Sequence, residues 1–148
     1  MPKPDRKKIV HRIIDANINR ATEGLRVCEE VTRFILNDKG LTTSFKKIRH
    51  GINTILKCLP KKTELLRYRQ SRNDVGKGIY INELKRSNYQ EIFFANIQRV
   101  KESIRVLEEF SKLMNKKTAV GFKRLRYGIY ELERKTAKKI FPGIETRL

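Results

Sequence analysis

The residues best suited to chemistry form a polar line that occurs twice in the chain. Asn17, Arg20 and Gly24 are spaced i, i+3 and i+7, which places them along one side of a helix, and Asn96 and Arg99 repeat the line. Arginine offers a planar fork that matches phosphate oxygens, and asparagine both donates and accepts hydrogen bonds. The line suits a groove for an anion or a polar heterocycle. The alternative is a polar network that sets the register of two helices.

Small residues accompany both lines. Gly24 in the first copy corresponds to Ser103 in the second, and either would leave room beside the Asn and Arg head groups. Asparagine is a poor helix former, so its presence at two equivalent mid-helix positions indicates a specific hydrogen-bonding demand.

Charged residues occupy the next positions around these helices. Their spacings of three and four residues are those of surface ion pairs. They are Glu23, Arg26 and Glu30 in the first copy and Glu102, Arg105 and Glu109 in the second. Arg49 and Arg126 are also repeated, each two residues before a glycine that we expect at a close helix contact.

A glycine-rich segment, residues 74–78, lies between the two copies. It lacks the preceding strand and the Lys-Ser/Thr ending of a phosphate-binding P-loop. Asp74 remains a candidate Mg²⁺ ligand, and Gly76 would allow close approach of the backbone to a ligand.

An internal duplication must position these residues. Residues 16–33 recur at 95–112 with nine of eighteen positions identical, and residues 45–52 recur at 122–129. Apolar residues follow helical spacing in both copies, in stripes running from Ile14 to Ile35 and from Phe93 to Met114. The pattern predicts an all-α fold: an antiparallel helical bundle of two repeated long-helix hairpins.

We expect residues 1–148 to form one domain, with the repeat at about 9–59 and 88–140. Turns are predicted at 37–40 and 115–118, and Asn88 is a plausible helix cap. The linking segment, 60–87, has no counterpart in the second copy, and we expect a short helix at 62–69 followed by an irregular loop. Loops of this length inside a compact domain are often functional.

Composition limits the class of protein. The net charge of +19 favours anionic partners, and no stretch is apolar enough to cross a bilayer. The N-terminus leads into no apolar signal core, so we expect a cytoplasmic protein. Cys28 and Cys58 lack metal-ligand spacing, and Cys28 lies on the apolar stripe.

Three segments carry a family resemblance: 15–27 with Arg33 and Phe34 after it, 74–76, and 95–109. Together they resemble a helical family of thiamine biosynthesis that is often fused ahead of thiamine phosphate synthase and is assigned as a monofunctional hydroxymethylpyrimidine phosphate kinase. The resemblance covers nearly the whole chain. It implies transfer of the ATP γ-phosphoryl group to 4-amino-5-hydroxymethyl-2-methylpyrimidine phosphate.

The chain departs from this family in two ways. Arg69-Gln70-Ser71 precedes the Asp-Val-Gly loop, where a carboxylate would be expected at Gln70. The synthase barrel is absent, because the chain stops soon after Phe141-Pro142-Gly143, so we expect a stand-alone version.

The implied reaction assigns roles to the repeated residues. The acceptor is a phosphate oxygen that is already anionic, so positioning and charge neutralisation suffice. Phosphate ligands are expected among the arginines, Arg20, Arg26, Arg99 and Arg105, with Arg49 and Arg69 in support; Arg20, Arg99 and Asp74 are the expected catalytic residues. Asn17 and Asn96 would hold the aminopyrimidine edge or orient an arginine. Glu23, Glu102 and Asp74 are the expected Mg²⁺ ligands.

Two other functions remain open at this point. A basic helical module would bind RNA or another polyanion, with affinity that falls steeply with salt. A partner-binding module would dock on a separately encoded thiamine phosphate synthase, which is compatible with kinase activity and with a homo-oligomer.

Overall fold

The computed structural model describes residues 5–142, so both ends of the predicted 1–148 domain, including Gly143, lie outside the described residues. Residues 5–142 contain helices and no strand, which confirms the all-α class. The long helices are α1 (Arg6–Glu30), α2 (Lys39–Leu56), α4 (Tyr89–Ser111) and α5 (Lys116–Ile140). The shorter elements are a π-helical turn (Val31–Ile35), α3 (Lys62–Arg67) and two 3₁₀ turns (Ser71–Asn73 and Ile81–Leu84).

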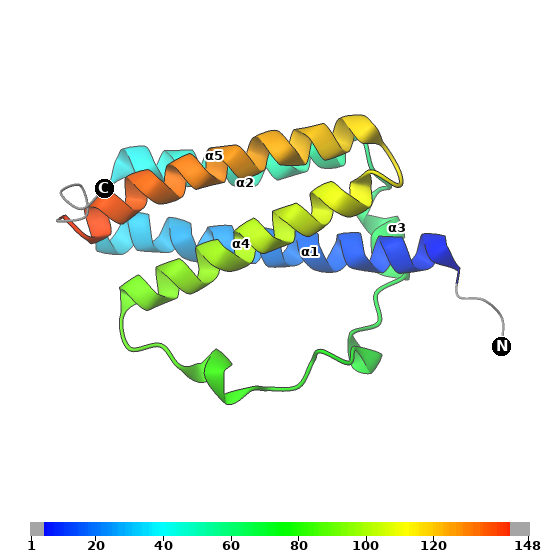
Figure 1. Cartoon of the computed structure of the whole chain (residues 1–148), viewed down its shortest axis with the longest axis horizontal. Coiled ribbons are helices and arrows are strands. Elements are labelled where there is room, and N and C mark those ends of the chain that lie inside the picture. The colour runs from blue at the N-terminus through cyan, green and yellow to red at the C-terminus, as the bar shows by residue number, and fades with distance from the viewer. Residues whose placement is uncertain (1–4, 143–148) are drawn as a thin grey trace.

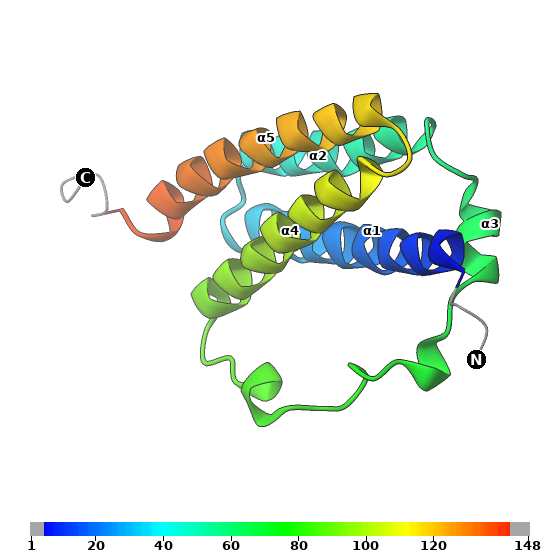
Figure 2. The same ribbon diagram turned by 45° about the vertical axis from the view of Figure 1, so that its right-hand side comes forward.

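The four long helices pack as a bundle of two antiparallel hairpins (Figure 1). One hairpin is α1 with α2, and the other is α4 with α5. Between the hairpins, α1 packs against α4 and α2 packs against α5. The view in Figure 2 separates the α1–α4 layer from the α2–α5 layer. Each copy of the sequence repeat is therefore one helical hairpin.

Polar side chains fix where the long helices begin. Asp5 and Asp38 accept hydrogen bonds from the backbone amides of Lys7 and Leu41. Asn88 accepts from the amide of Glu91, which confirms the predicted cap. Asn115 starts α5 in the same way. Because Asp38 and Asn115 act as caps, most residues predicted to lie in turns after them already belong to the first turns of α2 and α5.

The chain reverses between α1 and α2 after the π-helical turn, which the sequence analysis did not foresee. Asn37 has a positive φ of 49°, a left-handed conformation that asparagine tolerates. The amide of Asp38 donates to the carbonyl of Thr32. Ile35, predicted to continue the apolar stripe, is exposed, because the π-helical turn moves it off the buried face.

The two apolar stripes form the core. Phe45, Phe93 and Phe122, from α2, α4 and α5, are fully buried, and the rings of Phe45 and Phe93 meet edge to face. Cys28 is also fully buried, as predicted. Met114, predicted to end the second stripe, is exposed because α4 ends at Ser111.

Gly24 lies where α1 and α4 cross. A Cβ atom there would be 2.7 Å from Cγ2 of Val100 and 3.1 Å from the carbonyl oxygen of Asn96. The backbones therefore approach too closely for any side chain. The expectation that Gly24 leaves room for a ligand is wrong, because α4 occupies that room. Ser103 is buried too, and its hydroxyl donates to the carbonyl of Arg99.

The repeated glycines of the second helices differ. A Cβ atom on Gly51 would lie 3.1 Å from Leu125, as expected for a close helix contact, whereas one on Gly128 would meet nothing within 4 Å. The contact prediction is therefore confirmed at Gly51 and wrong at Gly128, which faces outward on α5.

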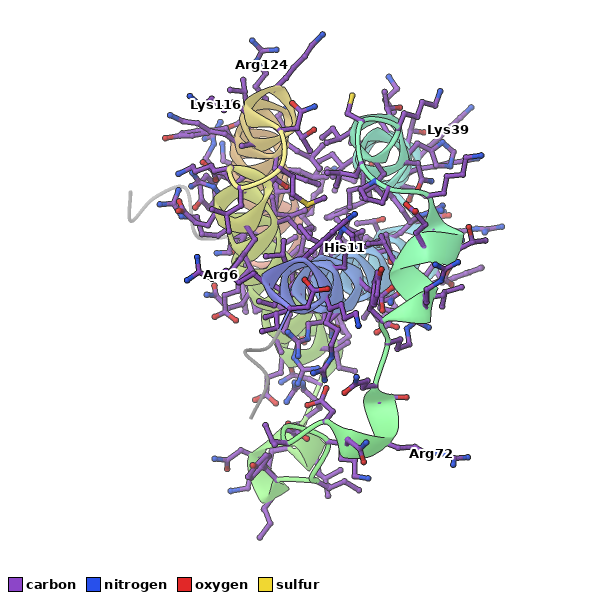
Figure 3. The ribbon with its side chains drawn as sticks, turned by 90° about the vertical axis from the view of Figure 1, so that its right-hand side faces the viewer. Arg6, His11, Lys39, Arg72, Lys116 and Arg124 are labelled. Atoms are coloured by element: carbon purple, nitrogen blue, oxygen red, sulfur yellow. The ribbon has the colours of Figure 1, made fainter. Side chains whose placement is uncertain are left out.

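The linking segment leaves the bundle after α3. Leu65 is buried and anchors α3 beside α1, while the chain from Ser71 onward arcs away from the helices toward α4 (Figure 1). Figure 3 shows Arg72 pointing away from the bundle. Among residues 5–142, no helix is both long and apolar enough to cross a membrane.

Candidate phosphate-binding site

A pocket of about 430 Å³ lies between the N-terminal half of α1 and the start of the linker. It brings together four of the predicted site residues from two separate parts of the chain. They are Asn17 and Arg20 from α1, and Arg69 and Asp74 from the linker; Arg12, Asp15, Asn19, Gln70 and Ser71 also line it.

One ion pair joins the two walls of this pocket. Nε and Nη2 of Arg69 donate to the two carboxylate oxygens of Asp15 over 2.7 and 2.8 Å. The Asp15 side chain is only 8% exposed, whereas that of Arg69 is 39% exposed. The hydrogen bonds that Arg69 donates to Asp15 raise the pKa of Arg69, so the guanidinium stays charged at every physiological pH. The pair therefore holds a permanent cation at the pocket.

Two further cations line the pocket without a partner. Within residues 5–142, the side chains of Arg12 and Arg20 make no ion pair or hydrogen bond. Arg20 is exposed and lies one helical turn beyond Asn17. Because unpaired guanidinium groups have their donors available, these two arginines are the groups best placed to bind an anion.

Asn17 is buried, and its Nδ2 donates to the carbonyl of Ile13 over 2.8 Å. Asn96 repeats this bond to the carbonyl of Ile92, also over 2.8 Å. The repeated asparagines therefore share a bond within their own helices. In the described part of the chain, Oδ1 of Asn17 accepts no hydrogen bond, which leaves an acceptor at the pocket wall.

Asp74 forms the far wall. Its Oδ1 accepts a hydrogen bond from the amide of Gly76 over 2.8 Å, which closes a tight local turn. Gly76 itself lies outside the pocket lining. The described residues include no group of three or more His, Cys, Asp or Glu side chains arranged to hold a metal ion. A carboxylate such as that of Asp74 suits a Mg²⁺ ion that arrives bound to phosphate oxygens, because such an ion needs only one or two protein carboxylates.

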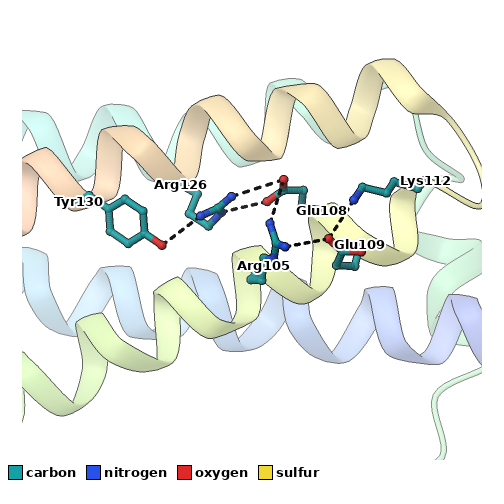
Figure 4. Close-up of polar contacts among 6 residues, drawn as sticks. All are labelled: Arg105, Glu108, Glu109, Lys112, Arg126 and Tyr130. Carbon is teal, nitrogen blue, oxygen red and sulfur yellow. Dashed lines mark hydrogen bonds and ion pairs between the residues drawn. The ribbon is translucent and has the colours of Figure 1, made fainter.

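The other predicted arginines take part in two equivalent ion-pair clusters. In the first, Arg26 and Arg49 both reach Glu29, with Nε of Arg49 at 3.0 Å. In the second, Arg105 and Arg126 both reach Glu108, with Nε of Arg126 at 2.9 Å (Figure 4).

Both central carboxylates are buried, with side chains 6% and 5% exposed. Each cluster ties the two helices of one hairpin together. Figure 4 also shows the hydrogen bond from Arg126 to the hydroxyl of Tyr130, and this bond and the pairing with Glu108 raise the pKa of Arg126. Arg26, Arg49 and Arg105 thus lie outside the pocket lining and already have carboxylate partners.

The remaining predicted residues lie on exposed helix surface outside the pocket lining. Glu102 accepts a hydrogen bond from Gln98 over 3.1 Å. Within the part of the chain that the structure describes, Arg99 and Glu23 make no ion pair. Glu23 and Arg20 lie three residues apart on α1.

Sequence reasoning missed Arg12 and Asp15. The signal for Asp15 was a charged residue next to the buried Ile14, at a position where the second copy has the apolar Phe94. His11 is buried, with its ring centre 5.2 Å from that of Tyr68, and neither of its nitrogens has a hydrogen-bond partner within residues 5–142. The alignment of repeats does not mark His11, because its counterpart is the polar Gln90.

Comparison with known proteins identifies the family of this chain. The ThiD2 family model matches residues 12–135. The thiamine-phosphate synthases of Nostoc punctiforme and Synechocystis are 38% identical over 128 and 125 residues, covering 86% and 84% of this chain and 35% of each relative. That of Rhodopirellula baltica is 37% identical over 135 residues, covering 88% of this chain and 36% of the relative.

The chain spans about a third of the length of these relatives. No solved structure gives a significant match. The matches confirm the link to thiamine biosynthesis, and since the family model covers most of the described helices, this chain belongs to the ThiD2 family.

Proposed function

We propose that the chain is a kinase that transfers the γ-phosphoryl group of ATP to hydroxymethylpyrimidine phosphate, giving the pyrophosphate. The observation that carries the proposal is the pocket in which Arg12, Arg20 and Arg69 converge with Asn17 and Asp74. Three guanidinium groups and two carboxylates, one of which is paired with Arg69, surround a cavity of about 430 Å³ and match the needs of a phosphoryl-transfer site.

The reaction requires no proton abstraction. The attacking oxygen belongs to a phosphate monoester and is anionic near neutral pH, so the protein must hold two negatively charged phosphates in line. Arg12 and Arg20, which have no carboxylate partner among residues 5–142, would bind the phosphates directly. Arg69, oriented by Asp15, would offset charge that develops in the transition state.

Asp74 would contribute a carboxylate oxygen to Mg²⁺ bound by the phosphates, and the ion would screen the charge between them when bound. Oδ1 of Asp74 holds the amide of Gly76, so the turn fixes the direction of its carboxylate. Asn17, with its Oδ1 acceptor, would orient the substrate or a guanidinium group.

The predicted residues outside this pocket would support the reaction by binding the second substrate or by holding the helices together. Arg99 and Glu102 on α4, with Glu23 on α1, remain candidate ligands for the second substrate and its Mg²⁺. Asn96, whose Nδ2 is used by the carbonyl of Ile92 in the same helix, would orient Arg99 or the substrate through its Oδ1. Arg26, Arg49 and Arg105 would act mainly by holding the hairpins together through their buried carboxylate partners.

The proposal is tested with purified protein, ATP, Mg²⁺ and authentic hydroxymethylpyrimidine phosphate, following formation of the pyrophosphate by ³¹P NMR. Stoichiometric formation of the pyrophosphate and ADP is expected. A folded protein that gives no product at millimolar ATP and Mg²⁺ would overturn the proposal.

A second function is favoured by the partial coverage of the relatives. The matched region makes up only 35–36% of the length of the thiamine-phosphate synthases, so in those relatives it is joined to a longer portion of chain. We propose that the chain docks on such a synthase through the exposed apolar side chains of the linker, including Tyr80 and Ile81. Co-elution with a thiamine-phosphate synthase, lost in a Tyr80→Ser, Ile81→Ser double variant, would support docking.

A further inference from the structure

A second pocket adjoins the first along α1. It has a volume of about 350 Å³ and lies between α1, α2 and α3. Asp15 and Asn19 line both pockets. The two pockets are therefore neighbours along α1, close enough for one ligand to contact residues of both.

The internal repeat shows what opens this pocket. Thr22 and Asn53 in its lining correspond to Lys101 and Tyr130 in the second hairpin. There, Nζ of Lys101 lies 2.9 Å from a carboxylate oxygen of Glu133 and 5.9 Å from the centre of the Tyr130 ring. The second hairpin thus fills the place with a packed polar cluster, whereas the first has smaller side chains there and an open pocket.

The pocket walls combine apolar surface with amide groups. Ile18, Leu59 and Leu65 are buried side chains that offer apolar surface to a flat ring. The side-chain amide of Asn53 makes no hydrogen bond with any residue of 5–142, so both its donor and its acceptor are available. Nδ2 of Asn19 is used by the carbonyl of Asp15, which leaves its Oδ1 as an acceptor.

These groups match the edge of an aminopyrimidine. Such a ring presents an amino donor next to a ring-nitrogen acceptor, and a primary amide complements both at once. The lysines at the pocket, Lys57, Lys61 and Lys62, make no ion pair within the described chain, so they leave positive charge at its edge. The chemistry favours a phosphorylated aminopyrimidine over a purely apolar ligand.

We propose that this second pocket binds the aminopyrimidine ring of a substrate whose phosphate lies in the first pocket, with Asn53 recognising the ring edge. The inference rests on the proposed kinase function and assigns its ring-binding site. Hydroxymethylpyrimidine phosphate and the adenine of ATP share this edge, and binding experiments with each ligand separate them.

The test introduces the residue of the second hairpin, which fills this place, into the first hairpin, where the pocket is open. Asn53→Tyr should fill the pocket as Tyr130 does in the second hairpin, and the matched control, Tyr130→Asn, alters the equivalent place across the bundle. Isothermal titration calorimetry measures binding of hydroxymethylpyrimidine phosphate and, separately, of ADP with Mg²⁺. We expect Asn53→Tyr to weaken one ligand at least tenfold, and Tyr130→Asn to change neither by more than twofold.

The ligand whose affinity falls in Asn53→Tyr identifies which ring occupies the pocket. The inference is overturned if the unaltered protein binds neither ligand, or if Asn53→Tyr retains both affinities. Circular dichroism checks that the variant is folded, and Thr22→Lys, which copies Lys101, provides the same test from α1. Loss of ring binding in a protein without turnover would refute the kinase proposal alone, whereas full turnover with unchanged binding in Asn53→Tyr would refute only the ring site.

Discussion

Asp15 and Arg69, 54 residues apart in the chain, are joined by two hydrogen bonds of 2.7 and 2.8 Å. The repeat counterpart of Asp15 is Phe94, which stacks on Phe141 at 5.8 Å instead of pairing with a cation. The pair therefore joins the linker, which occurs once, to a helix that occurs twice. It makes the two hairpins structurally unequal, and Asp15 lines both pockets of the first hairpin.

Neutralising Asp15 should loosen the linker. In Asp15→Asn, one charged partner of Arg69 is lost, and hydrogen bonds to charged groups contribute about 1.5–3 kcal/mol. We expect amide hydrogen exchange in residues 62–74 to become at least fivefold faster and kcat/KM to fall about tenfold, since Arg69 loses its orientation. Glu133→Gln, which breaks the pair with Lys101 in the other hairpin, should leave exchange in 62–74 unchanged. Equal exchange in Asp15→Asn and the unaltered protein would contradict this role.

Glu108 should be essential for stability. Glu108→Gln leaves the guanidinium of Arg126, whose side chain is 11% exposed, without its charged partner. Removing one member of such a buried pair should lower the free energy of unfolding by about 2–4 kcal/mol, measured by urea denaturation. The adjacent Glu109→Gln, which alters exposed pairs with Arg105 and Lys112, is the control and should have no measurable effect. The reverse order of the two effects would disprove the assignment.

Gly24 and Gly128 should respond oppositely to alanine. Gly24→Ala places a methyl group 2.7 Å from Val100, so we expect destabilisation by about 1–3 kcal/mol. Gly128→Ala meets nothing within 4 Å and should stabilise α5 by about 0.5–1 kcal/mol. Thermal unfolding of both variants measures the difference. A stable Gly24→Ala would mean that α1 and α4 are farther apart than the structure shows.

The two cysteines should differ in reactivity. Burial, together with the nearby charge of Glu133, raises the pKa of Cys28, so its thiol stays protonated at pH 8, whereas Cys58 is exposed. Because the thiolate is the reactive form, one thiol per chain should react rapidly with a disulfide reagent in the native protein and both in urea. Cys58→Ser should abolish the rapid phase. Rapid modification of two thiols without denaturant would contradict the burial of Cys28.

Much of the fold could be predicted from the sequence because its strongest signals are local. Helical spacing of apolar residues and the cap at Asn88 depend on neighbours within a few turns, and both were correctly identified. The π-helical turn at Val31–Ile35 and the close crossing at Gly24 were missed, since each depends on how a helix meets a distant part of the chain.

The candidate site was only partly predictable for the same reason. Asn17 and Arg20 follow from the repeated line, and Asp74 from the loop chemistry. Asp15 could not be assigned a role, because its partner Arg69 reaches it only through the path of the linker. The repeat also made Arg26 a candidate phosphate ligand like Arg20, with Arg49 in support, although the buried Glu29 between Arg26 and Arg49 is visible only in the folded chain.

The most direct test of the central claim is kcat/KM for phosphoryl transfer in Arg20→Ala compared with Arg124→Ala. Arg20 lines the phosphate pocket, whereas Arg124 is an exposed arginine on α5, distant from α1 in Figure 3. The loss of one positioned cation should reduce kcat/KM about 100-fold in Arg20→Ala, with helical content unchanged, and Arg124→Ala should stay within twofold of the unaltered protein. A folded Arg20→Ala protein with the same kcat/KM as Arg124→Ala would contradict the account.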